Sequence, residues 1–208
     1  LGFDVLSAAF YLASGYAFYQ TEAKDDHGRY DEQALFPVQQ ELHTHPWVHH
    51  YADYLARQLA VITGRRLQLP APDHNLTWDI DRPWAYRHQG LFRQLKGSLG
   101  DLRHSGIATM LERWQTLAGF RLDPFYTYAL IRQYSPPAKT TCFFLINGQT
   151  RYDSLYSAQH EAYQKLILDL REAGFSTGLH PSYQTMLKPA LLQQEKARLE
   201  GVLQQPVT

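Results

Sequence analysis

The chain has 208 residues, enough for one domain or somewhat more, and its hydrophobic share of 44% is a globular composition. Its 20 basic and 20 acidic residues balance without a cluster of Lys and Arg, so no nucleic-acid partner is expected. No apolar run approaches the roughly 20 residues that cross a bilayer, and the first residues lack a basic signal-peptide region. We therefore expect no membrane span, and a cytoplasmic rather than a secreted protein.

Helical spacing dominates the first part of the chain. Apolar residues three and four apart predict a helix over about 3–19 and a second one over about 46–63. Residues 67–73 carry two prolines and are typical of a connector. The sequence thus predicts a helical accessory region over 1–70 and a second domain over 71–208.

Strands and helices alternate in the second domain, which predicts an α/β fold with a parallel sheet and right-handed crossovers. Asp123 followed by Pro124 is typical of a helix start, and Cys142, inside an apolar run, is expected to be a core residue. The expected elements are a strand at 75–81, a broken helical region at 91–120, a helix at 123–134, a strand at 139–146, a helix at 157–174, a strand at 175–180 and a helix at 189–203.

Two carboxylates stand at the end of the first expected strand. Asp79 and Asp81 are two residues apart, so on a strand both side chains point to one face. Carboxylates this close repel each other unless one is protonated or a cation lies between them. The pair indicates a cation site or a catalytic pair, and a solvated strand exit is the alternative interpretation.

A histidine stands at the end of the third expected strand. His180 could give a neutral imidazole to a divalent metal, and a loop histidine bonded to backbone is the alternative. Because active sites lie where the carboxyl ends of barrel strands meet, His180 is expected close to Asp79 and Asp81. Carboxylate and imidazole together suit Zn, Co, Mn, Ni or Fe, with Zn expected first. The histidines between His43 and His50 are predicted to be surface residues.

Six segments of the second domain, each weakly specific alone, form an ordered series. In order and spacing the series resembles the NodB-type polysaccharide deacetylases, in a bacterial branch whose Bacteroidetes members carry an extra N-terminal region; residues 3–14 and 26–30 resemble that region. The six segments are Thr77-x-Asp79-Ile80-Asp81, Trp84 to Gly90, Asp123 to Phe125, Phe143 to Leu145, Arg151 to Asp153, and Gly178 to Tyr183.

The resemblance implies a partial irregular (β/α) barrel, the first half only, behind a mainly helical N-terminal region. It also implies metal-dependent hydrolysis of N-acetyl or O-acetyl groups on the sugars of a polysaccharide or oligosaccharide. On this pattern Asp79 resembles the general base, while Asp81 and His180 resemble metal ligands. The expected substrate contacts are Trp84, Tyr86, Ser182 and Tyr183.

The chain departs from the family pattern in three ways. Ile80 separates the two aspartates, which the family has side by side, so their roles could be exchanged. Gln184 stands where the family has a second metal histidine, four residues after His180. The late histidine that acts as the acid has no counterpart. We therefore expect the 208-residue chain to be a truncated part that is inactive alone, and its open strand edges favour a homodimer.

Two other functions compete with deacetylation. The first is a non-catalytic carbohydrate-binding or interaction domain, whose aromatic platforms for sugar rings would be Trp78, Trp84, Tyr86 and Tyr183. The second is a glycosyltransferase, in which an Asp-x-Asp pair binds a metal and a sugar nucleotide. It predicts a nucleotide pocket, of which the sequence has no sign, so the first is the stronger alternative.

Overall fold

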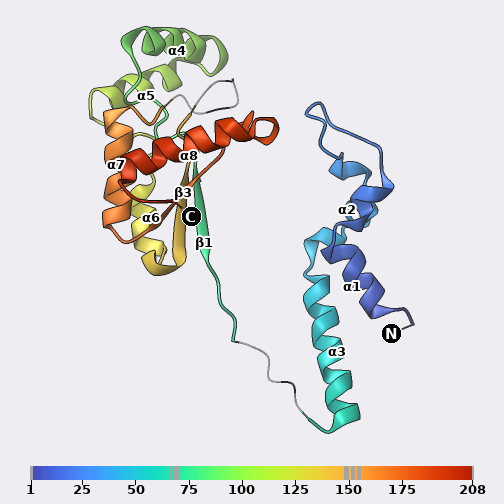
Figure 1. The fold of residues 1–208 in the computed structure, drawn as a ribbon. Coiled ribbons are helices and arrows are strands. Elements are labelled where there is room, and N and C mark those ends of the chain that lie inside the picture. Colours follow the sequence, from blue (N-terminus) through green and yellow to red (C-terminus); the bar gives the residue numbers. More distant parts are fainter. Residues whose placement is uncertain are drawn as a thin grey trace. The chain divides into compact units, whose positions relative to one another are not determined.

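The computed structural model describes residues 2–65, 67, 71–147, 150, 153 and 156–207 (Figure 1). The chain divides into two compact units, Leu1–Pro72 and Asp73–Thr208. The boundary expected at residue 70 lies close to this division, although residues 68–70 themselves are outside the described part.

The first unit is helical. α1 (Val5–Ala13) begins at Asp4, whose carboxylate accepts the backbone N–H groups of Leu6 and Ser7. The helix was expected to continue to about residue 19, but Gly15 adopts a φ of 65° and a 3-10 helix follows at Tyr16–Gln20. A left-handed glycine ends an α-helix because it turns the chain away from the helix axis.

The remaining elements of the first unit lead to a long helix. Two 3-10 helices, Glu32–Ala34 and Leu42–Thr44, flank the short α2 (Phe36–Gln39). α3 (Trp47–Thr63) packs against α1 and ends at Gly64, which has a φ of 67°. This second helix therefore has the bounds that its apolar spacing predicted.

The described residues of the second unit form three parallel strands: β1 (Leu76–Ile80), β2 (Thr140–Phe144) and β3 (Ser176–Leu179). Their order in the sheet is β1-β2-β3, so β2 is central. Asp79 pairs with Phe143, and Phe143 pairs with Gly178. A Cβ on Gly178 would overlap the Phe143 ring, which explains why a glycine stands in the middle of β3.

The prediction of a partial (β/α) barrel is wrong. In the second unit, the described residues form a mixed helix and strand fold with a small three-stranded parallel sheet that does not close on itself. Within them β1 and β3 each pair only with β2, whereas a barrel requires strands to pair all the way round. Alternating strands and helices predict parallel pairing, but they do not determine whether a sheet curls into a barrel.

The α-helices in the described part of the second unit are α4 (Leu91–His104), α5 (Ile107–Leu117), α6 (Tyr128–Tyr134), α7 (Glu161–Glu172) and α8 (Pro189–Leu203). The break expected within 91–120 occurs at Gly106, whose φ is 90°. α7 and α8 contact each other and β3 (Figure 1). In the part of the chain that the structure describes, no helix combines the length and apolar character of a membrane crossing.

The hydrophobic core of the second unit lies between the sheet and its helices. Cys142 and Phe144 of β2 are fully buried, as the apolar run predicted for Cys142. They belong to one cluster with Ile80 of β1, Tyr163 of α7 and Leu199 of α8. Burial raises the pKa of the Cys142 thiol to about 11, so this cysteine is a packing residue rather than a nucleophile.

Candidate functional site

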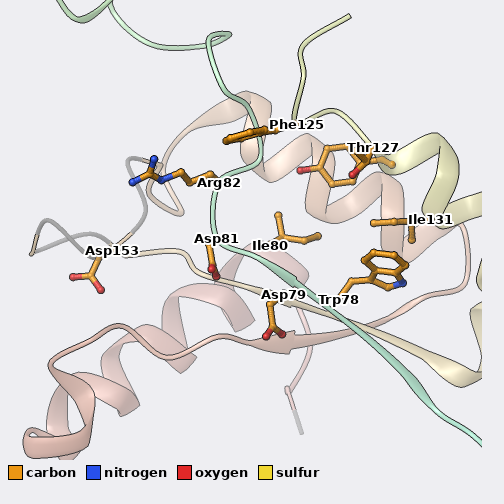
Figure 2. A pocket seen from close by; sticks show the side chains of 10 residues that line it. Trp78, Asp79, Ile80, Asp81, Arg82, Phe125, Thr127, Ile131 and Asp153 are labelled. Carbon is orange, nitrogen blue, oxygen red and sulfur yellow. The ribbon is translucent and has the colours of Figure 1, made fainter. Parts of the chain in front are cut away.

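The alternation of side chains along β1 places two carboxylates on one face of the sheet. Figure 2 shows Asp79 and Asp81 pointing to one side of the strand and Ile80 pointing to the other. Ile80 is buried in the core, whereas both aspartates are exposed. The burial of Ile80 therefore fixes the direction of both carboxylates.

Hydrogen bonds extend the sheet one residue beyond its strands. The N–H of Leu145 donates to the carbonyl of Ile80 at 3.3 Å, and the N–H of His180 donates to the carbonyl of Phe144 at 3.0 Å. Asp81, Leu145 and His180 are thus neighbours across the sheet. Two strand spacings, about 10 Å, separate the backbones of Asp81 and His180.

The side chains of Asp81 and His180 close most of that gap. Nε2 of His180 lies 3.6 Å from Oδ1 of Asp81, and the two side chains are 34% and 57% exposed. The structure thus brings together one of the two aspartates and the histidine that stand far apart in the sequence. Asp79 lies on the same face, one alternation step earlier on β1.

The other ring nitrogen of His180 faces the backbone. Nδ1 lies 3.1 Å from the carbonyl oxygen of Pro181. An imidazole with its proton on Nδ1 donates to that carbonyl and turns the lone pair of Nε2 toward the Asp81 carboxylate. Metal-binding histidines commonly have this arrangement, because the second hydrogen bond fixes the tautomer. A lone pair facing a carboxylate oxygen leaves room for a proton or a cation between them.

A hollow of about 430 Å³ opens beside β1 (Figure 2). Its lining includes Asp79, Asp81 and Arg82 of the first strand and its exit, together with Phe125 and Asp153. Ile80 also lines it, so the hollow extends around the edge of β1 rather than over one face only. Small ligands and water can therefore reach both carboxylates.

The loop after Asp81 is held by a carboxylate with a role that its motif did not indicate. Asp123 was expected to cap a helix, but α6 begins only at Tyr128. Instead its buried carboxylate accepts the N–H groups of Ala85, Tyr86 and Arg87 at 2.7, 2.9 and 3.0 Å. It also accepts the N–H of Phe125. Asp-Pro predicts a backbone cap, but not which backbone is capped.

The four expected substrate contacts lie in different environments. Trp84 is only 5% exposed, and its ring lies 5.2 Å from that of Tyr156 in the core. Tyr86 is half-buried under the guanidinium of Arg113, and burial raises the pKa of its phenol. Ser182 is buried, whereas Tyr183 is 50% exposed. Of the three aromatic residues among them, Tyr183 offers the most accessible ring.

Two further carboxylates hold the segment that follows His180. Asp153 accepts the N–H of Tyr183 at 2.8 Å, and Glu195 accepts the N–H of Ser182 at 3.0 Å. Sequence reasoning assigned no role to Glu195. The available signal was its position on α8, because a charged residue stands in line with the apolar Leu191 and Leu199.

The remaining predicted positions add no residue to the candidate site. Arg151 and Tyr152, which belong to the motif series, lie outside the described residues. His43, His45, His49 and His50 are exposed, as expected for surface residues. Within 2–65, 67, 71–147, 150, 153 and 156–207, no group of three or more His, Cys, Asp or Glu is arranged to hold a metal ion. Asp81 and His180 therefore stand as a pair of donors.

The family-model comparison matches only part of the first unit. A family described as "Family of unknown function (DUF7033)" matches residues 1–63. No curated protein matches the chain. No solved structure matches it either. The matched residues belong to the helical unit, whereas the candidate site lies in the other.

Proposed function

We propose that this chain contributes to the metal-dependent hydrolysis of N-acetyl or O-acetyl groups on the sugars of a polysaccharide, as in the NodB-type deacetylases that its motifs resemble. The observation that carries the proposal is the 3.6 Å approach of His180 Nε2 to Asp81 Oδ1 across the sheet. The expected base, Asp79, lies on the same face.

The donor pair fits a divalent metal. Zinc binds imidazole nitrogen and carboxylate oxygen at about 2.0–2.2 Å in tetrahedral sites, which places two ligand atoms about 3.3 Å apart. The 3.6 Å between the donors of His180 and Asp81 is close to that separation. Zinc is the first choice, and Co, Mn, Ni and Fe accept the same donors. When bound, such an ion polarises an acetyl carbonyl and lowers the pKa of bound water.

The chain's own residues would supply the remaining tasks. Asp79 is exposed and can take a proton from water at the same face of the sheet. Tyr183, half exposed and anchored through its N–H to Asp153, can offer its ring to the apolar face of a sugar. The proposal assigns the base to Asp79 and the ligand role to Asp81, and substitution of each distinguishes them.

The test measures acetate release from acetylated chitooligosaccharides by the full-length natural protein, with added Co²⁺ or Zn²⁺. Asp79→Asn and His180→Ala are each expected to lower kcat/KM by about 100-fold or more, since each removes a general base or a metal ligand. Asp73→Asn is the matched control, because Asp73 is an exposed carboxylate before the start of β1 and should leave activity unchanged. Full activity in both test variants would contradict the assignment.

The same experiment distinguishes the deacetylase from the alternative, a non-catalytic carbohydrate-binding domain. If the wild-type protein binds the oligosaccharide but releases no acetate with either metal, the chain is better described as a carbohydrate-binding domain. In that case Tyr183→Ala should abolish binding, whereas Asp79→Asn should not.

A further inference from the structure

Glu195 is a buried carboxylate that none of the motifs explains. Its exposed fraction is 0%, and it stands on α8 in line with the buried Leu191, Leu199 and Leu203. Burying a carboxylate is costly unless hydrogen bonds satisfy it, and an apolar residue would pack at this position at lower cost. Its contacts should therefore show what the carboxylate does.

Three donors converge on its two oxygens. Oε2 accepts the N–H of Ser182 at 3.0 Å, while Oε1 accepts the hydroxyl of Ser182 at 2.5 Å and the Nδ2 amide of Asn147 at 3.0 Å. Arg198 donates to Oδ1 of Asn147 at 3.1 Å, which keeps the NH₂ of that amide turned toward Glu195. A carboxylate satisfies all three donors because it only accepts.

These bonds act on the segment that carries the imidazole. Ser182 is two residues after His180, and Pro181 between them restricts the backbone. On the other side of Ser182, the N–H of Tyr183 is held by Asp153. The N–H of Ser182 is thus bound to Glu195 of α8 and the N–H of Tyr183 to Asp153, which lies between β2 and α7, while the N–H of His180 is bound to the carbonyl of Phe144. Both sides of the imidazole-bearing residue are fixed.

We infer that Glu195 is a positioning residue: by binding both donors of Ser182, it keeps His180 directed at Asp81. The inference rests on the proposed function in treating His180 as a metal ligand. The direction of the imidazole, however, can be measured without metal, so the two can fail separately.

The test uses Glu195→Gln in the 208-residue chain. The glutamine side chain has nearly the same shape, but its NH₂ must face either the Ser182 N–H or the Asn147 NH₂, so one donor loses its acceptor. The control is Leu199→Ala on the next turn of α8, which removes buried side-chain atoms of the same helix but neither hydrogen bond from Ser182 to Glu195. Ser182→Ala provides a milder variant that removes only the hydroxyl bond.

The first readout is made without metal, by NMR. In wild type and in Leu199→Ala, we expect a nuclear Overhauser effect between the His180 ring and the Asp81 β-protons, and slow exchange of the Ser182 amide. In Glu195→Gln both should be lost, and in Ser182→Ala both should be weakened. An unchanged Overhauser effect and unchanged amide exchange in Glu195→Gln would overturn the inference, whatever the metal does.

The second readout is Co²⁺ affinity. Glu195→Gln should weaken it by about tenfold or more, as substitutions behind metal ligands do, whereas Leu199→Ala should lower the melting temperature and keep the affinity. Equal loss in the control would show that Glu195 acts only through stability and would overturn the inference. If the wild-type 208-residue chain binds neither Co²⁺ nor Zn²⁺, the assignment of His180 as a metal ligand within this chain fails, and the NMR readout alone decides whether Glu195 positions His180.

Discussion

The two units of the chain differ in how much of their apolar surface they bury. In the described part of the first unit, Val5, Ala17 and Leu35 are the buried hydrophobic residues, and large side chains such as Phe10 and Ile62 are exposed. The second unit contains the whole of the described hydrophobic cluster. Similar helical periodicity in the sequence therefore accompanies very different degrees of packing.

The two units also differ in their match to a known family and in the candidate site residues that they hold. The first unit matches a family of unknown function over residues 1–63, and its histidines are exposed, with four of them between His43 and His50. The second unit has no such match, yet its parallel strands bring Asp81 and His180 together. A rigid sheet, with a packed core behind it, holds side chains at a fixed separation more reliably than an open helical unit.

The largest expected effect is on the cooperativity of thermal unfolding when the two units are produced as separate fragments. Residues 73–208 alone are expected to unfold in one cooperative thermal transition, because the hydrophobic cluster lies entirely within them. Residues 1–72 alone are expected to show helical circular dichroism with a broad, weakly cooperative transition, since small units with little buried surface are marginally stable. A sharp transition in the first fragment and none in the second would reverse the comparison.

Two glycines of the second unit should respond oppositely to the same substitution. Gly178→Ala forces a Cβ against the Phe143 ring in the sheet and should cost about 1–3 kcal/mol of unfolding free energy. Gly201→Ala on α8 meets no atom within 4 Å and should stabilise by about 0.5–1 kcal/mol through helix propensity. Urea unfolding measures both, and a neutral Gly178→Ala would show that the sheet is looser than described.

The smallest expected effect concerns pH. Burial, followed by the nearby His160 and Arg87, lowers the pKa of His88, so the folded state favours the neutral ring. The contribution of His88 to the free energy of unfolding is therefore present above the usual histidine pKa of about 6.5. It is lost as the pH falls through the lower pKa that His88 has in the folded state. His88→Asn tolerates the φ of 59° at this position and should reduce the fall in melting temperature between neutral and mildly acidic pH.

A larger pH dependence in His88→Asn than in wild type would contradict this account. The effect should be only a small shift in melting temperature, because His88 is only partly buried and water screens its charge. His27→Asn, an exposed histidine of the first unit, is the matched control.

Much of the secondary structure followed from local patterns in the sequence. Apolar spacing predicted α3 and α8 with nearly their observed bounds, and the apolar run 139–146 predicted β2. The closed or open state of the sheet could not be predicted in this way, because it depends on which strands meet at the edges. The early end of α1 depended on the left-handed conformation of Gly15, which apolar periodicity does not report.

The candidate site was predictable only in part. The two-residue spacing of Asp79 and Asp81 indicated a shared face, because strand periodicity is a local property. The tasks of Asp123 and Glu195 could not be read from the sequence, since their partners lie far along the chain and their hydrogen bonds exist only after folding. The burial of Trp84 was missed for the same reason, because an aromatic residue suits a sugar platform and a core equally well.

Cobalt binding by the 208-residue chain is the most direct measurement of whether Asp81 and His180 act together. We expect one Co²⁺ per chain, with an affinity that falls by about tenfold or more in Asp81→Asn and in His180→Ala. The double variant should lose little more than either single one, since both act at one ion. A triple His43, His45 and His49 to Ala variant should bind as wild type does. Wild-type affinity in both Asp81→Asn and His180→Ala, or loss only in the triple variant, would contradict a shared cation at the strand ends.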